Sequence, residues 1–272
     1  MKAAAIFQSA EQNILAGAHL HASVNPSTGY DLAVLGYLRP DMRVKWDVGT
    51  VTIDFEVLPD GLSPPTPARG DIFVLPMHNL DGGSPNLARL TNDSGLSQDI
   101  TVPEALGNGL PRTIVIDLTI DNPNTATRTS AYWHLIIQGN SAPVQLGGAV
   151  AIYNPKQALV DRDFQFGYTF KKQGFVLDAE NDYGTRFRQD LQTMRRWVDL
   201  QTIATTDDAD ALEAWFEANH GAAKPGLLWF DPNIQDAFLG YLGEDFGRTF
   251  LFDDAEAITL SFEELSKGRP IA

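Results

Sequence analysis

The chain has 272 residues, of which 43% are hydrophobic, and it carries a formal net charge of -15 at pH 7. This length suits one large or two ordinary domains with a substantial buried core. The absence of cysteine excludes disulfides, thiolate zinc sites and cysteine nucleophiles. Both halves are acidic, which disfavours stable binding to nucleic acid, because that binding needs clustered Lys and Arg.

The sequence contains neither a signal-peptide pattern nor a membrane-span pattern. Residues 1–8 lack the apolar stretch of a signal peptide, and no run of about 18 apolar residues occurs. We therefore expect a protein that is made and used in a cytoplasm, or that leaves without a signal, as a virion does at lysis. The acidic surface suits a conduit that DNA crosses without sticking, because like charges repel. Solubility alone is the alternative explanation.

Short strand patterns separated by turns fill the first half. Residues 48–57 alternate, with Val51, Ile53, Phe55 and Val57 on one face and polar side chains on the other. Further strand patterns occupy residues 71–75, 113–120 and 131–138. Segments rich in Gly and Pro lie between them, at residues 59–61, 63–67, 81–85 and 121–124. Short strands at this spacing predict a β-sandwich.

A domain boundary is predicted between residues 150 and 162. The strand pattern of residues 149–153 ends at Asn154-Pro155-Lys156, which breaks it. We assign residues 1–153 to the first domain and residues 162–272 to the second. Strand patterns in the second domain occupy residues 164–170, 186–203, 225–230, 237–242 and 257–265.

One helix is predicted in the second domain, over residues 207–220. Residues 205–208 supply N-cap candidates and early acidic charge, which suits the positive end of the helix dipole. Leu212, Trp215 and Phe216 fall on one apolar stripe, and Gly221 follows as a stop signal. The predicted fold class is therefore mainly β, with one α-helix in the second half.

The motifs of residues 162–267 follow one another in a distinctive order. A glycine-containing tip with arginines (183–188) precedes a strand bearing tryptophan (196–197) and then the acidic helix. An apolar strand with Asp-Pro (227–232) and a closing strand that ends in glutamates (258–265) follow. This order resembles the minor tail protein M family of lambda-like phages and the related distal-tail proteins of gene transfer agents.

Five segments of the first half carry a second resemblance, and they are residues 44–46, 51–55, 75–80, 132–135 and 146–150, with the segment 77–80 the most telling. Through them the first half is similar to discoidin-type, galactose-binding-like jelly rolls. A loop of exposed aromatics for sugar or lipid insertion is not evident. The two resemblances together predict a jelly-roll β-sandwich followed by a β-rich tail-ring domain.

The resemblance implies a structural protein of the virion tail that is assembled in the host cytoplasm. It would form a ring with copies of itself, six-fold like the tail tube or three-fold where the hub begins. Its other partners would be the tail tube protein, the hub and the receptor-binding proteins. No cofactor is implied. In such a ring the arginine cluster Arg186, Arg188, Arg195 and Arg196 would pair with carboxylates of the neighbouring subunit; a solvated strand surface is the alternative.

The histidines offer few candidates for chemistry. His78 beside Asn79 is interpreted as a loop anchor, with ligand contact as the alternative. His19 and His21 would share one face of a strand, but a pair without a third ligand is weak evidence, so no metal site is predicted. His134 is expected to face solvent.

An enzymatic role is not expected from the sequence. A Gly-x-Ser-x-Gly elbow and a phosphate-binding glycine loop are both absent. Two other functions stay open: a module that binds a host surface glycan during adsorption, and a hydrolase of cell-wall polysaccharide. Calcium in an acidic loop of the jelly roll also stays open. The five tryptophans are expected in the core.

Overall fold

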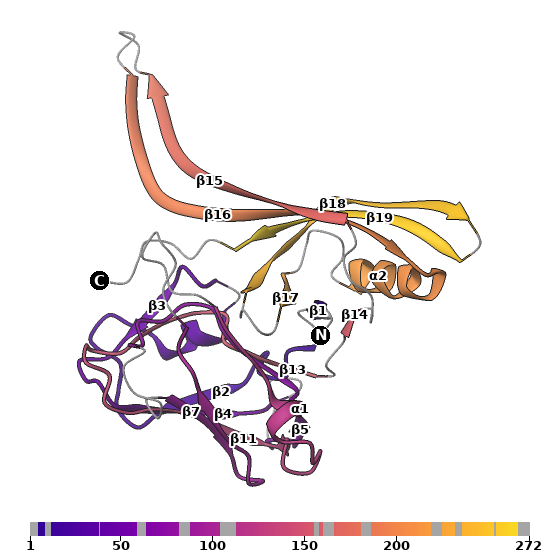
Figure 1. Cartoon of the computed structure of the whole chain (residues 1–272). Coiled ribbons are helices and arrows are strands. Elements are labelled where there is room, and N and C mark those ends of the chain that lie inside the picture. Colours follow the sequence, from indigo (N-terminus) through magenta and orange to yellow (C-terminus); the bar gives the residue numbers. More distant parts are fainter. Residues whose placement is uncertain are drawn as a thin grey trace.

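The computed structural model describes residues 5–8, 12–37, 39–58, 64–81, 88–103, 113–154, 158–159, 166–180, 186–218, 225–231, 236–252 and 254–265. The fold is mainly β, as predicted, with antiparallel sheets in both halves and the two α-helices α1 (Leu118–Asp121) and α2 (Thr206–Ala218) among the described residues (Figure 1). None of the helices described is long and apolar enough to cross a membrane.

The first half is a sandwich of two main antiparallel sheets. One has the order β2-β4-β11-β7-β8 and the other the order β13-β6-β9. The bounds of these strands are β2 His19–Ala22, β4 Val51–Glu56, β6 Ile72–Leu75, β7 Ala88–Asn92, β8 Ser97–Ile100, β9 Ile114–Asp117, β11 Tyr132–Ile137 and β13 Ala151–Tyr153. Two small pairs complete it: β3 (Arg43–Lys45) with β12 (Gln145–Gly147), and β5 (Ala68–Arg69) with β10 (Thr129–Ser130); a 3₁₀ helix spans Leu32–Gly36.

The sequence pattern explains the burial of these strands. In β4 every second residue is buried, so Val51, Ile53 and Phe55 face the core, as the alternation predicted. All of β6 is buried, because Phe73 and Leu75 enter the sandwich core while Ile72 and Val74 face the second half of the chain. A strand covered on both faces needs a continuous apolar run.

The predicted strand over residues 113–120 ends early. β9 stops at Asp117, and α1 follows at once. The carboxylate of Asp117 accepts hydrogen bonds from the backbone N and the hydroxyl of Thr119, at 2.9 and 2.6 Å. This cap offers the backbone an alternative to the ladder, so the apolar alternation is overridden by local hydrogen bonding.

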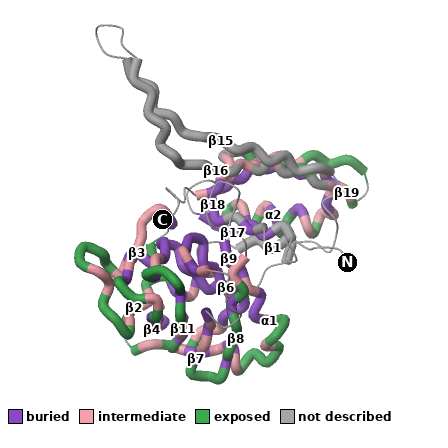
Figure 2. Tube along the Cα trace, turned by 60° about the vertical axis from the view of Figure 1, so that its left-hand side comes forward, coloured by how far each residue is buried: buried purple, intermediate pink, exposed green. Residues whose placement is uncertain are grey.

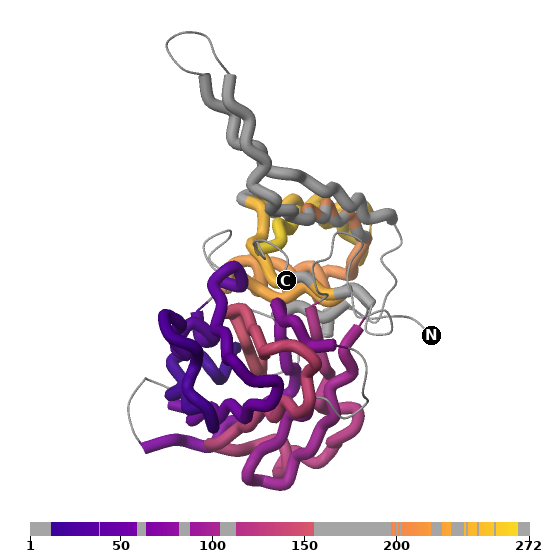
Figure 3. The backbone as a smooth tube through the Cα atoms, turned by 90° about the vertical axis from the view of Figure 1, so that its left-hand side faces the viewer, coloured from indigo at the N-terminus to yellow at the C-terminus, as the bar shows by residue number. Residues whose placement is uncertain are grey.

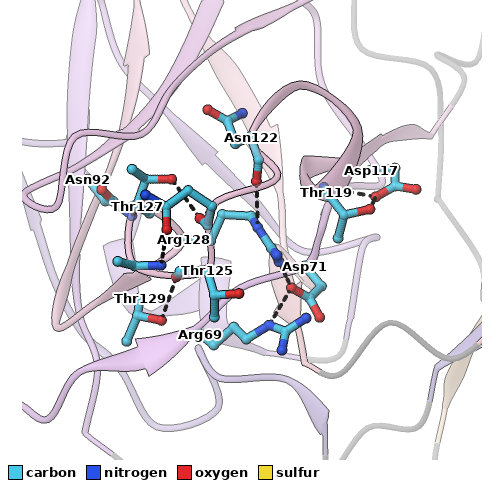
Figure 4. A network of polar contacts seen from close by, with 12 residues as sticks. Arg69, Asp71, Asn92, Asp117, Thr119, Asn122, Thr125, Thr127, Arg128 and Thr129 are labelled. Atoms are coloured by element: carbon cyan, nitrogen blue, oxygen red, sulfur yellow. Dashed lines mark hydrogen bonds and ion pairs between the residues drawn. The ribbon is translucent and has the colours of Figure 1, made fainter.

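A buried ion pair holds the segment between β9 and β11. Asp71 is fully buried, and Arg128 and Arg69 both donate to its Oδ1 (Figure 4). Arg128 also donates from Nε to the Asn122 carbonyl at 2.7 Å. Asn92 reaches the Thr127 carbonyl at 2.9 Å, so polar groups fix this segment from several sides.

The second half is built on one seven-stranded antiparallel sheet with the order β14-β1-β17-β18-β19-β16-β15. Its strands are β1 Ala5–Gln8, β14 Ala158–Leu159, β15 Phe166–Glu180, β16 Arg186–Ala204, β17 Gly226–Asp231, β18 Asp236–Phe252 and β19 Ala255–Glu264. β1 pairs with β17, with Ile6 opposite Trp229. The first strand of the chain thus joins the second sheet, although residues 1–153 were assigned to the first domain; the boundary itself stays a prediction.

Helix α2 covers one face of this sheet. It spans Thr206–Ala218, close to the predicted range 207–220, of which residues 219 and 220 lie outside the described residues. The Thr205 hydroxyl accepts a hydrogen bond from the Asp208 N–H at 3.3 Å. Leu212 and Trp215 are buried against the sheet, and Phe216 packs beside them, as the apolar stripe predicted.

Arg248 in β18 ties the helix to the sheet. Its Nη1 lies 2.7 Å from the Asp210 carboxylate and 2.6 Å from that of Glu213, both in α2. Its Nε and Nη2 also donate to Glu256 in β19. The hydrogen bonds with Arg248 lower the pKa of the Glu256 carboxyl.

The two halves share a hydrophobic core. Tyr153 and the outward residues of β6 pack with Trp229 in β17 and Leu239 in β18. Burial raises the pKa of the Tyr153 phenol. Figure 2 shows purple, buried backbone around the labels β6 and β9, and Figure 3 shows the sandwich directly beside the strands of the second half. The halves therefore form a continuous packed unit.

Candidate functional site

The most distinctive feature of the molecule is a long β-hairpin formed by β15 and β16. The register runs from Phe166 opposite Gln201 to Glu180 opposite Arg186. β19 pairs with β16 over Trp197–Ala204, so among the described strands the stretch Arg186–Arg196 pairs with β15 alone. We call this two-stranded part the arm; it projects beyond the sheet (Figure 1).

All four arginines of the predicted cluster lie in the arm. The side chains of Arg186, Arg188, Arg195 and Arg196 are outside the described part of the structure, but their backbone positions are defined. The register places Glu180 opposite Arg186 and Asp178 opposite Arg188. Arg195 and Arg196 are opposite Gln173 and Lys172. Whether these arginines contact a neighbouring subunit stays a prediction.

An exposed apolar end closes the β18–β19 hairpin. Phe250, Leu251 and Phe252 are 66%, 41% and 65% exposed. Three consecutive large apolar side chains at such exposure are uncommon on a solvated surface. This apolar end is a second candidate contact surface, and the sequence reasoning had not singled it out.

Three histidines share the outer face of the five-stranded sheet. His19 and His21 lie on its edge strand β2, and His134 lies on β11. The strand between them, β4, contributes Asp54 and Glu56 to this face. The register aligns His21 and His134 with Asp54, and His19 with Glu56.

His19, His21 and Glu56 form one compact cluster. Nδ1 of His19 lies 3.3 Å from Oε2 of Glu56, and Nε2 of His21 lies 3.6 Å from Oε1 of the same carboxylate. The imidazole centroids are 4.6 Å apart. All three donor atoms lie within 4.8 Å of one another, so the cluster has the composition and the spacing of a three-ligand metal site.

His134 is half-buried between two carboxylates instead of facing solvent freely. Its Nδ1 lies 2.7 Å from Asp54 and its Nε2 lies 3.0 Å from Asp93. Burial alone lowers the pKa of His134, but the hydrogen bonds and charges of Asp93 and Asp54 outweigh it, so its pKa is raised. The acceptor at each nitrogen stabilises the protonated ring relative to the neutral one, which is why the pKa rises.

His78 and Asn79 hold a loop against the sandwich. His78 is buried, and its Nδ1 accepts a hydrogen bond from the Leu80 N–H at 3.2 Å. The Asn79 side chain donates to the Pro143 carbonyl at 2.8 Å and accepts from the Gln145 N–H at 2.7 Å. These contacts are those of a loop anchor; a ligand contact at either residue stays a prediction.

A shallow polar pocket lies on the seven-stranded sheet. Asp199, Gln201, Asp245, Thr259, Leu260 and Ser261 line it. It sits beside the irregularity of β18 between Leu242 and Phe246. The pocket contains the carboxylates of Asp199 and Asp245. Hydrolysis of a cell-wall polysaccharide, which needs a pair of carboxylates at a defined separation, stays a prediction from the sequence.

The predicted core tryptophans are found where expected, with one exception. Trp46, Trp133, Trp215 and Trp229 are buried, whereas Trp197 in the long hairpin is only partly buried. The sequence reasoning missed Glu56, Asp54 and Asp93 as neighbours of the histidines, because the first two come from β4 and Asp93 comes from the turn after β7. Only a correct prediction of strand pairing could have found them.

No protein-family model and no curated protein matches this chain. The resemblance to tail proteins therefore depends on the order of motifs in the sequence alone, and the surfaces described above must carry the functional argument.

Proposed function

We propose that this chain is a structural protein of the tail tip of a long-tailed bacteriophage. Copies of it form a ring, six-fold to match the tube or three-fold at the hub. The ring joins the tail tube protein to the hub and the receptor-binding proteins. The mechanism is assembly through β surfaces and charge pairs, and no step of it requires catalysis or a cofactor.

The arm is the observation that carries the proposal. Over Arg186–Arg196, β16 pairs with β15 and with no other described strand. A two-stranded hairpin is marginally stable in water unless a third strand or a packed surface supports it. The described part of the chain supplies no such support, so a neighbouring molecule is the natural partner for the arm.

The edges of the sheet point to the same kind of partner. In the described sheet, β15 is one terminal strand and β14 the other. A long terminal strand presents unpaired N–H and C=O groups that favour addition of another chain. Closed rings form when each subunit presents one such surface to the next.

The exposed apolar end of the β18–β19 hairpin adds a packing surface. Phe250 and Phe252 would lose water when they meet an adjoining tail component, and each buried aromatic contributes favourably. The net charge of -15 suits a ring whose passage DNA must cross without binding.

The location of the protein tests the proposal directly. Particles released by the cells that encode the chain are labelled with a gold-conjugated antibody against it. We expect label at the end of the tail distal to the capsid. Absence of the chain from purified particles, or label spread along the capsid, contradicts the proposal.

A charge reversal tests the contribution of the arm. Arg186→Glu with Arg188→Glu should weaken the assembly, because both positions lose the charge that a neighbouring carboxylate would bind. The reversal also puts like charges opposite Glu180 and Asp178, which destabilises the hairpin itself. A four-site swap that adds Asp178→Arg and Glu180→Arg restores opposite charges within the hairpin.

Light scattering on the two variants separates these effects. If the arginines contact a neighbour, assembly should fall in the double variant and should not be fully restored in the swap. Far-UV circular dichroism checks that the chain stays folded. An oligomer mass that is unchanged in both variants removes the arginines from the interface.

A further inference from the structure

We infer that His19, His21 and Glu56 form a binding site for a divalent transition-metal ion, with Zn²⁺ as the reference ligand. The inference depends on the geometry of the sandwich and not on the proposed role in a tail. It changes the expectation drawn from the sequence, in which the two histidines lacked a third ligand.

The local structure places the two imidazoles together. His19 and His21 are two residues apart on β2, so both project from the outer face, while Leu20 between them packs against the core. β2 is the edge strand of its sheet, and Glu56 at the end of β4 is directly opposite His19. The backbone thus fixes two ligands on one strand and a third on its neighbour.

The distances between the donor atoms are close to those of metal ligands. Donor atoms about 2.0–2.1 Å from a tetrahedral Zn²⁺ are separated by about 3.3 Å from one another. The observed nitrogen–oxygen separations are 3.3 Å for His19, where the contact is also a hydrogen bond, and 3.6 Å for His21. The two contacts use different oxygens of the Glu56 carboxylate, so rotation of that side chain would bring one oxygen and both imidazoles onto one ion.

The donor set selects the class of metal. Two imidazoles and one carboxylate suit Zn²⁺ and its neighbours in the first transition row, whereas Ca²⁺ and Mg²⁺ prefer sites made of oxygen atoms. The side chains of His19, His21 and Glu56 are 61%, 53% and 28% exposed. A fourth coordination position therefore opens to solvent, where water or a group from another molecule would complete the shell.

The neighbouring histidine provides an internal contrast. His134 has a carboxylate within hydrogen-bond distance of each ring nitrogen, so a metal ion would have to displace one of these contacts. An imidazole must offer a free lone pair to bind a metal. His134 lies on the same sheet face as the cluster and is accordingly a matched control.

Calorimetric titration of the untagged, EDTA-treated full chain with ZnCl₂ tests the inference. We expect one Zn²⁺ per chain and affinity that falls as pH is lowered, because the imidazoles must be neutral to bind. The double variant His19→Asn/His21→Asn should lose the site, and Glu56→Gln should bind at least tenfold more weakly. His134→Asn should bind Zn²⁺ like the wild type. Asp99→Asn, which removes one negative charge as Glu56→Gln does, should also bind Zn²⁺ like the wild type.

Two further readouts keep the result interpretable. Co²⁺ bound to the wild type should give the visible absorption of a site with nitrogen ligands, and the double variant should not. Zn²⁺ should raise the Tm of the wild type and leave that of the double variant unchanged. The inference is overturned if the wild type binds no Zn²⁺ or if the double variant binds Zn²⁺ as tightly as the wild type does. It is also overturned if His134→Asn abolishes binding as the double variant should.

Discussion

The N-terminal sandwich packs its two main sheets around one hydrophobic core, whereas the arm of the second half extends beyond the other described strands of its sheet. The sandwich buries one large core that includes Trp46, Phe55 and Trp133. The second sheet buries one cluster under α2 and another against the sandwich, while the strands of the arm pair with each other and with no other described strand. The sandwich thus has a large core of its own besides the core that it shares with the second half, and the second sheet has surfaces suited to a partner.

The two halves also differ in how far their ion pairs are exposed to solvent. In the sandwich, Asp71 and Arg128 form a pair enclosed by protein. In the second half, Arg248 pairs with the buried Glu256 and also joins α2 to the sheet through Asp210 and Glu213, whose side chains are 62% and 45% exposed. An enclosed pair is costly to break, while the contacts of Arg248 with the exposed carboxylates of α2 are screened by solvent.

Breaking the enclosed pair should produce the largest loss of stability. Asp71→Asn leaves the Arg128 charge buried without its counter-charge, so we expect a loss of roughly 4 kcal/mol in the free energy of unfolding. Asp99→Asn is the control, because Asp99 pairs with Arg89 on the surface and should contribute less than about 1 kcal/mol. Urea unfolding of both variants measures the difference in the free energy of unfolding. Equal losses in the two variants would show that the burial of Asp71 does not add to the cost of removing its charge.

Loosening the junction between the halves should have the next largest effect. Leu239→Ala removes a buried side chain from the core that β18 shares with the sandwich, at a cost of roughly 3 kcal/mol. The two halves should then unfold in separate calorimetric transitions. Leu260→Ala is the control, since Leu260 packs only within the second half and should leave their coupling intact. Indistinguishable transition shapes in the two variants would contradict a shared core.

Local patterns explain which parts of the fold could be predicted from the sequence. The alternation in β4, the long pattern of β16 and the capped acidic helix α2 each depend on neighbours within a few residues. The early end of β9 was missed because the hydrogen bonds of Asp117 compete with an apolar pattern that favours a strand.

The features that were missed depend on contacts between distant residues. Ile6 in β1 is paired with Trp229 in β17, which lies near the other end of the sequence. No local pattern of β1 indicates which sheet this strand joins. His19 and Glu56 are 37 positions apart, so the third ligand becomes visible only when β2 and β4 are paired. The all-apolar run of β6 was predicted as a core strand, but its two-sided burial between the halves requires the tertiary arrangement.

The smallest effect should come from His134, and its size depends on pH. The pKa of His134 in the fold is raised above its ordinary value of 6.5, so protonation stabilises the folded chain. This contribution is fully present below pH 6.5 and is lost as pH rises through the raised pKa. His134→Asn should therefore reduce stability at pH 5.5 and have less effect at pH 8.5.

The size of that effect is limited by solvent. The Asp54 and Asp93 side chains are 41% and 63% exposed, so screening keeps the contribution of His134 below about 1 kcal/mol. Urea unfolding of wild type and variant at the two pH values measures it, and 1 M salt should shrink the difference at pH 5.5. A difference that is the same at both pH values would mean that His134 contributes through packing alone. The outer face of the sandwich would then lack the charge coupling that its three carboxylates and three histidines indicate.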